Sequence, residues 1–132
     1  MKIEDHLRNI NESLEVIKES IQKGIQERQR TIGFNVSVAS VEMLEVYLHK
    51  NNLINPGNVL KHNWFNSINK INEHLNFEFE NKEKIIKLLS DIEAKRNFLC
   101  YGKPRPEEEI ISVLDFFNKI KSLFENMGLK WN

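Results

Sequence analysis

Apolar residues recur every three or four positions along most of the chain, a spacing typical of amphipathic helices. The first such stretch runs from Ile3 to Ile25, and charged and amide side chains occupy the positions between the apolar ones. Gly24 falls on its last turn, where glycine favours a bend or a helix end. We therefore expect a long amphipathic helix at the N-terminal end of the chain.

A second stretch, Ile32 to Leu48, is richer in apolar and small residues. Its β-branched content would also suit a strand, but its length and its helical apolar spacing favour a buried helix. The apolar positions include an aromatic residue, Phe34, which we expect in the core. Three small residues would let another helix approach closely: Gly33, Ser37 and Ser40. We interpret this stretch as the central helix of a bundle.

The middle of the chain contains turn signals and only short periodic segments. Pro56-Gly57 predicts a turn within a loop over residues 51–58, and Ser67 to His74 fits a short helix. Residues 59–65 are too mixed to assign. Residues 76–81 alternate apolar and acidic side chains, but no second strand is available to pair with them. We expect an extended connector there, anchored to the core by Phe77 and Phe79.

Two further helices follow. Asn81 suits the N-cap of the first, Gly102 suits its C-terminal end, and Pro106 fits the first turn of the second. Gly128 ends the second helix, and Trp131 is placed to dock back on the bundle. The sequence therefore predicts an all-α fold, an up-down antiparallel bundle of four or five helices in a single domain over residues 1–132.

Composition narrows the class of protein. The chain has 132 residues, 40% of them hydrophobic, and no apolar run long enough to span a bilayer. It has no secretory signal and a single cysteine, which fits a reducing, cytoplasmic setting. With 19 basic and 19 acidic residues, the chain does not suit a general nucleic-acid binder with a strongly basic surface. A local basic site remains open.

The richest chemistry lies between Asp91 and Glu109, where one predicted helix ends and the next begins. Arg96 and Asn97 fall on the last turns of the first helix, and Tyr101 shares a helix face with Asn97 because they are four residues apart. The alternative for Arg96 and Asn97 is a purely structural role. Arg96 could complement the negative end of the helix, and Asn97 could cap its free carbonyl groups.

The heptapeptide Arg96 to Gly102, Arg-Asn-Phe-Leu-Cys-Tyr-Gly, resembles the signature of the HEPN superfamily (higher eukaryotes and prokaryotes nucleotide-binding). That signature is an arginine, usually followed by asparagine, and then a histidine four to six residues later, near the junction of two bundle helices. The resemblance implies a helical homodimer in which two copies of the motif face one cleft. Many HEPN proteins cut RNA without a metal, some as toxins of toxin–antitoxin pairs. Others are non-catalytic partners of minimal nucleotidyltransferases.

Carried over residue by residue, the motif makes Arg96 and Asn97 catalytic candidates, and Tyr101 stands where the family has histidine. Tyrosine is a poor general base at neutral pH, but it can donate a hydrogen bond, stack on a base or hold a phosphate. We therefore expect binding of nucleotide or RNA phosphate in a polar cleft of a homodimer. A metal-independent endoribonuclease and a partner subunit of a nucleotidyltransferase are the alternatives. The candidates for binding nucleotide or RNA are Lys95, Lys103, Arg105 and His62.

The other histidines receive structural interpretations. His6 and His74 look like solvated helix positions, and His49 is placed to cap the negative end of the central helix. His62 could lie over the bundle end near Trp64, where a structural role is favoured over a catalytic one. No His/Cys spacing suits zinc, and we expect no metal or cofactor. The single thiol is expected to be buried or half-buried.

Overall fold

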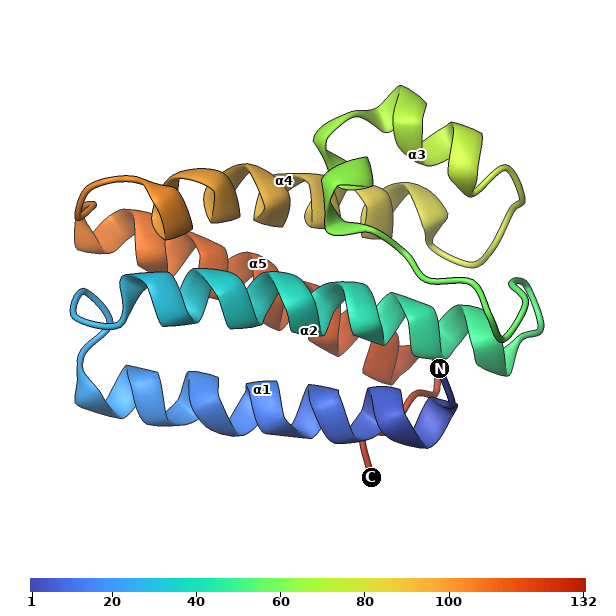
Figure 1. Ribbon diagram of the computed structural model, residues 1–132, viewed down its shortest axis with the longest axis horizontal. Coiled ribbons are helices and arrows are strands. Elements are labelled where there is room, and N and C mark those ends of the chain that lie inside the picture. Colours follow the sequence, from blue (N-terminus) through green and yellow to red (C-terminus); the bar gives the residue numbers. More distant parts are fainter.

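Four long helices lie side by side and form a bundle, and a shorter helical segment projects at one end (Figure 1). The computed structural model describes residues 1–132. Successive long helices run antiparallel, so the predicted all-α up-down bundle is confirmed. The elements are α1 (Ile3–Lys23), α2 (Gln29–Lys50), the 3-10 helix η1 (His62–Asn66), α3 (Ile68–His74), α4 (Lys82–Tyr101) and α5 (Glu107–Asn126).

Helix α1 ends where the sequence predicts. Gly24 follows its last residue with a φ of 131°, a backbone conformation that side chains other than hydrogen rarely adopt, and its N–H donates to the carbonyl of Ser20. Ile10 and Ile17 are buried against α2. The interpretation of His6 as a solvated position is wrong, because this side chain is only 2% exposed between α1 and α2.

Helix α2 is the central helix, as predicted, and packs against α1, α4 and α5. Close approach to α4 depends on Gly33, since a Cβ atom there would lie 3.0 Å from the Cβ of Leu99. The expectation that Phe34 lies in the core is wrong. Phe34 is 48% exposed, because α2 meets α4 along the face that carries Gly33 and leaves the neighbouring position outside.

The segment between α2 and α4 folds over one end of α4. Residues 62–66, which the sequence left unassigned, form η1, and α3 follows it as predicted, with the Ser67 hydroxyl accepting from the Lys70 N–H. Phe77 and Phe79 are partly buried against the core and anchor the connector into α4. This segment matters for function because it carries His62 onto the side of α4.

The turn between α4 and α5 also follows the sequence signals. Gly102 ends α4 in an extended conformation, and Pro106 immediately precedes α5, whose first turn carries three glutamates. Trp131 packs edge-on against Phe124 and donates its indole N–H to Glu125, so the C-terminal tail docks on the bundle as expected.

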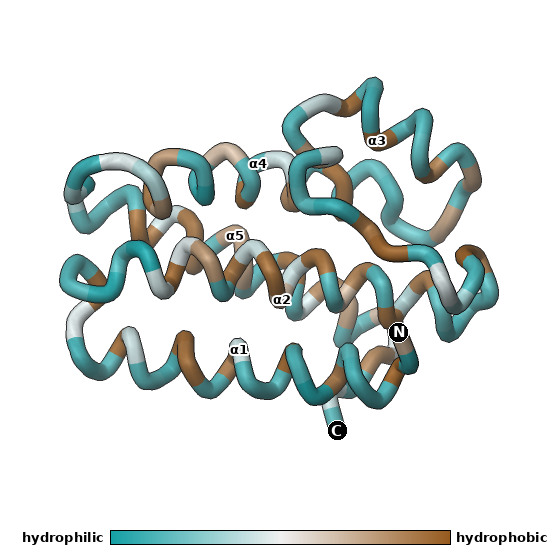
Figure 2. The backbone as a smooth tube through the Cα atoms, viewed as in Figure 1, coloured by the Kyte–Doolittle hydropathy of each residue, from teal (hydrophilic) through white to brown (hydrophobic).

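Hydrophobic positions recur along the four long helices and are separated by hydrophilic ones (Figure 2). The buried ones form one continuous core of 27 residues that includes side chains from every helix. None of the helices combines the length and the apolar character that a membrane crossing requires. The polar side chains that could bind a ligand therefore lie on the surface and in a few buried polar clusters.

Candidate functional site

Arg96 lies on the second-last turn of α4 and is only 6% exposed. Its Nη1 atom is 2.9 Å from Nδ1 and 3.2 Å from Nε2 of His62, a residue 34 positions earlier in the chain. The same Nη1 atom lies 3.9 Å from Oε1 of Glu93, one helical turn before it. The motif arginine is thus paired with a histidine, but one that comes from η1 and not from the motif.

Glu93 holds this group together. The carboxylate is 2% exposed, faces Nδ1 of His62 at 3.0 Å and accepts a hydrogen bond of 3.4 Å from the Ser37 hydroxyl of α2. With Nδ1–H donating to Glu93, the Nε2 atom can accept from Arg96 at 3.2 Å, and the contact of 2.9 Å between Nη1 and Nδ1 is then not a hydrogen bond. We call Ser37, His62, Glu93 and Arg96 the Arg96 cluster.

The Arg96 cluster is nearly neutral but not fully satisfied. The guanidinium charge of Arg96 is balanced by Glu93, as buried charges require. The Nε atom of Arg96 is buried and has no hydrogen-bond partner in the protein. The guanidinium also lies 5.7 Å from the centroid of the Phe34 ring, within the range of a cation–π contact.

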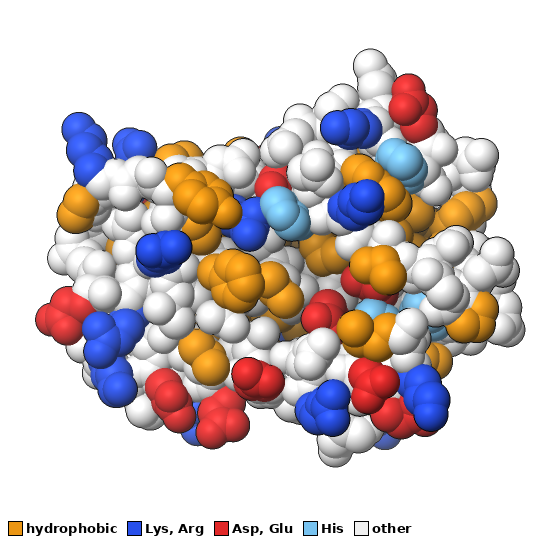
Figure 3. All heavy atoms as spheres, in the orientation of Figure 1, with side chains coloured by type: hydrophobic (Ala, Val, Ile, Leu, Met, Phe, Trp, Pro, Cys, Tyr) orange, Lys and Arg blue, Asp and Glu red, His pale blue; other side chains and the backbone are white.

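Polar groups extend from the cluster to the surface. The His62 side chain is 47% exposed, so one edge of its ring reaches solvent. Beside it, the exposed side chain of Asn97 donates to Oδ1 of Asn66 at 3.3 Å and links α4 to η1. On this face of the molecule, histidine, basic and acidic side chains lie next to exposed hydrophobic ones over α4 and α2 (Figure 3).

Tyr101, which stands in the motif position of the histidine, lies elsewhere. It is 72% exposed and makes no hydrogen bond with Arg96 or Asn97. With Phe34 and four other residues it lines a hollow of about 350 Å³ between α2 and the end of α4. The remaining lining residues are Arg30, Thr31, Asn35 and Cys100.

The other basic candidates do not join the Arg96 cluster. Lys95 pairs with Glu109 of α5 at 2.5 Å, and both Lys95 and Arg105 lie over the ring of Phe98, at 5.4 and 4.9 Å from its centroid. Lys103 is exposed in the turn that follows α4. The basic residues predicted to bind nucleotide therefore divide into His62 on the η1 side and three residues on the α5 side.

Hydrogen bonds between the Gln29 side chain and the backbone hold the turn that carries Lys103 and Arg105 in place. The side chain of Gln29 donates to the Lys103 carbonyl at 3.2 Å and accepts from the Arg105 N–H at 2.7 Å. Cys100 is buried, as expected, and donates weakly to the Arg30 carbonyl at 3.7 Å. Burial raises the pKa of this thiol, which disfavours the reactive thiolate. We assign it a packing role.

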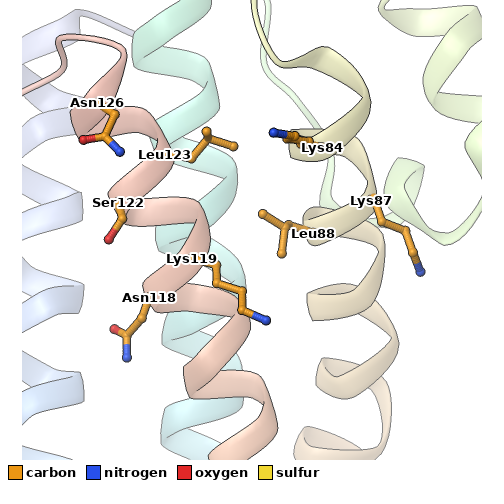
Figure 4. Close-up of a pocket in the computed structure, with 8 residues that line it drawn as sticks. All are labelled: Lys84, Lys87, Leu88, Asn118, Lys119, Ser122, Leu123 and Asn126. Carbon is orange, nitrogen blue, oxygen red and sulfur yellow. The ribbon is translucent and has the colours of Figure 1, made fainter.

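A groove between α4 and α5 contains none of the predicted residues. It measures about 640 Å³, and Leu88 and Leu123 point toward each other across it from the two helices (Figure 4). Its basic residues Lys84, Lys87 and Lys119 stand on the rim, and Lys87 is paired with Asp91 at 2.8 Å. Exposed lysines on an open groove do not hold donors in place for one ligand. A substitution in this groove is therefore a suitable control for binding through general charge.

Sequence reasoning identified Arg96, Asn97 and His62 as candidates, but it missed the residues that connect them. Glu93 was overlooked although it lies three residues before Arg96, a spacing that places two charges on one helix face. Ser37 and Asn66 gave no sequence signal, because only the packing of α2 and η1 on α4 brings them there. Comparisons of the chain with protein-family models, with curated proteins and with solved structures found no match.

Proposed function

We propose that the surface formed by His62, Asn66, Arg96 and Asn97 binds the phosphate group of a nucleotide or of RNA. One observation carries this proposal. A buried, oriented arginine lies 2.9 Å from a histidine that is half exposed, with two amide side chains beside them. Guanidinium, imidazole and amide groups are the hydrogen-bond donors that recognise phosphate oxygens.

The arrangement suits a phosphate because its donors are already oriented. Glu93 keeps the Arg96 guanidinium in place, so little side-chain freedom is lost when a ligand binds. A phosphate oxygen that replaces the His62 ring as the acceptor of Nη1 would receive a charge-assisted hydrogen bond. Protonated His62 would then donate a second one, and the Asn97 amide, which reaches solvent, a third.

Phe34 extends this surface in a way that favours a nucleotide over free phosphate. Its ring is 48% exposed and 5.7 Å from the Arg96 guanidinium. Exposed aromatic rings beside basic groups are the usual stacking surfaces for unpaired bases, a contact worth about 1–3 kcal/mol per base. The preferred ligand is therefore single-stranded RNA or a mononucleotide.

The test measures fluorescence anisotropy of a short dye-labelled oligouridylate against the wild-type protein and variants. We expect His62→Ala and Asn97→Ala each to weaken binding about tenfold, since each removes a hydrogen bond to a charged group. Arg96→Lys should weaken it more, because lysine keeps the charge but loses the planar donor pair.

Two controls make the result specific. Lys119→Ala removes a charge from the rim of the α4–α5 groove, and His74→Ala removes an exposed histidine that stacks on Trp64. Both should leave the affinity unchanged. If Lys119→Ala weakens binding while His62→Ala does not, the RNA binds elsewhere through general charge and the proposal is wrong.

We also propose that a second copy of the chain covers the hollow between Phe34 and Tyr101. These two rings are 48% and 72% exposed, and they flank the hollow from α2 and α4. Phe34 joins this apolar surface to Arg96, so a two-fold contact there would bring two Arg96 clusters toward one cleft. A homodimer would then present a longer binding surface for RNA.

RNA cleavage is the second candidate function, and the position of His62 favours it. With Nδ1–H held by Glu93, the Nε2 atom can accept a proton from a ribose 2′-hydroxyl, as a carboxylate-oriented histidine does in other hydrolases. The attacking 2′-oxygen would form a cyclic phosphate and expel the 5′-oxygen of the next nucleotide. Arg96 would stabilise the charge that develops on the phosphorane oxygens.

Incubation of RNA with the protein in the presence of a chelator tests this second candidate, with 2′,3′-cyclic phosphate ends as the readout. His62→Ala should lower the cleavage rate by about a hundredfold or more, the usual contribution of a general base. Tyr101→Phe tests which of Tyr101 and His62 is the general base. It should leave the cleavage rate unchanged if His62 is the base. If the wild-type protein binds RNA but leaves it intact, cleavage is contradicted and phosphate binding remains the proposed function.

A further inference from the structure

A second buried polar cluster lies where the first turns of α1 run beside the last turns of α2 (Figure 1). It contains His6 from α1 and Glu42, Glu45 and His49 from α2. His6 and Glu45 are 2% and 3% exposed, and His49 is partly buried. The three α2 residues share one face of the helix because they are spaced three and four apart.

Three polar atoms in this cluster have no hydrogen-bond partner in the protein. They are Nε2 of His6, Oε2 of Glu45 and Nε2 of His49, and all three are buried. His6 Nε2 and Glu45 Oε2 are 3.6 Å apart, and one potential ligand atom from each of the three residues lies within 4.8 Å of the other two. Buried polar atoms are nearly always paired, so three that converge on one point need an explanation.

The neighbouring groups orient His6 toward that point. Its Nδ1 atom lies 3.0 Å from Oε2 of Glu42, and the other oxygen of Glu42 accepts a hydrogen bond of 3.2 Å from Asn9. A carboxylate beside Nδ1 favours the tautomer that donates Nδ1–H, which leaves the unprotonated Nε2 atom facing Glu45, while the His49 ring stacks on the His6 ring with their centroids 5.6 Å apart. A histidine held by a carboxylate in this way is the usual arrangement of a metal ligand.

We propose that His6 Nε2, His49 Nε2 and Glu45 Oε2 bind a divalent transition-metal ion, with zinc as the best match. Two imidazole nitrogens and one carboxylate oxygen are a common zinc ligand set, and they leave a fourth position for water. The site would fasten the start of α1 to the end of α2. It lies in a different cluster from Arg96 and does not depend on the phosphate-binding proposal.

The distances are compatible with this ion after a small adjustment. Tetrahedral zinc with bonds of about 2.0–2.2 Å places its ligand atoms about 3.3 Å apart. The present separations, 3.6 Å for one pair and no more than 4.8 Å for the others, therefore require the donors to close by up to about 1.5 Å relative to that ligand spacing. His49 is the least buried of the three residues, and rotation of its side chain can supply this movement.

The electrostatics of the cluster also suit a cation. Glu45 faces this point from α2, and Glu42 lies at the Nδ1 side of the His6 ring, so two carboxylates lie close to the proposed ion.

Cobalt titration of protein without a polyhistidine tag tests the proposal, after treatment with a chelator and its removal. Tetrahedral Co²⁺ absorbs visible light, so we expect an absorption band that saturates at one equivalent per chain and disappears when Zn²⁺ is added. His49→Ala and Glu45→Gln should each weaken Co²⁺ binding about tenfold or more, by analogy with the loss of groups that support a metal site. His74→Ala, which removes an exposed histidine outside the cluster, should bind as the wild type does.

Glu45→Gln keeps the test decisive if His49→Ala fails to fold. The glutamine has nearly the same shape and removes a buried charge, so this variant is expected to fold, which circular dichroism checks. Zinc should raise the melting temperature of the wild type and, at the same concentration, raise that of Glu45→Gln less. The proposal is overturned if the wild type shows no saturable band, or if folded Glu45→Gln binds Co²⁺ with wild-type affinity.

Discussion

Arg96 and Glu93 are both buried in the side of α4. Glu93 is the carboxylate in contact with Arg96, and Glu93 contacts no basic group other than Arg96 and His62. Taking charges out of water is costly, so each of these side chains depends on the other. This dependence keeps the side chains of the Arg96 cluster in a fixed orientation. It also means that the loss of either charge destabilises the protein. A substitution here changes stability and binding together.

Arg96→Ala is therefore expected to destabilise the protein by about 3 kcal/mol, because it leaves the Glu93 carboxylate buried and uncompensated. The double variant Glu93→Gln with Arg96→Ala should lose less than the sum of the two single losses, because no charge remains unpaired. Urea denaturation followed by circular dichroism measures both values.

The neighbouring residue provides the matched control. Asn97 is exposed, so Asn97→Ala should change the stability by no more than about 0.5 kcal/mol while it still weakens RNA binding. Equal stability of Arg96→Ala and the wild type would contradict the view that Glu93 needs its partner.

At the scale of the helices, the end of α4 determines where the motif residues lie. Gly102 closes this helix with its N–H bonded to the Phe98 carbonyl, and its backbone is extended, with a φ of −105°. Its role is steric, because a Cβ atom at this position would lie 2.7 Å from the Phe98 oxygen. The prediction that this glycine ends the helix is confirmed.

Gly102→Ala should consequently destabilise the protein by about 1–3 kcal/mol, since the last turn of α4 must shift to accept the methyl group. Gly57→Ala is the control, because no atom lies within 4 Å of its added Cβ, and we expect an unchanged or slightly higher stability. The urea midpoints of the two variants measure the difference. A loss as large for Gly57→Ala as for Gly102→Ala would show that the effect belongs to the unfolded chain and not to the helix end.

At the scale of the whole molecule, the surface around Phe34 and Tyr101 is the place where a second copy would add most to the function. Large exposed hydrophobic side chains are common singly, but these two flank one hollow, and Phe34 adjoins the Arg96 cluster. A homodimer formed there would bury both rings. The alternative is a monomer that exposes them to solvent.

Size-exclusion chromatography with light scattering distinguishes these states. We expect twice the chain mass of 15.6 kDa for the wild type and a monomer for the double variant Phe34→Ser with Tyr101→Ser. Ile111→Ser, which alters a 45% exposed hydrophobic residue of α5, should remain a dimer. A monomeric wild type at concentrations where RNA binds would contradict the dimer.

The helices and their ends were predictable because local physics determines them. Apolar residues at three- and four-residue spacing must share a helix face, and glycine, proline and asparagine interrupt helices through their own backbone preferences. For this reason the sequence predicted all four long helices, the short helix after Ser67 and the docking of Trp131. The same reasoning failed at Phe34 and His6, where exposure depends on which helix packs alongside.

The sequence by itself thus determined the five α-helices, the antiparallel bundle and the candidate status of Arg96, Asn97 and His62, but not η1. Only the tertiary structure decided that His62 lies against Arg96 and Glu93, and that His6 meets Glu45 and His49. These contacts join residues more than thirty positions apart, so no periodic pattern encodes them. The physical reason is that helix periodicity fixes the face of a side chain, whereas the packing of α1, α2, η1 and α4 fixes its partner.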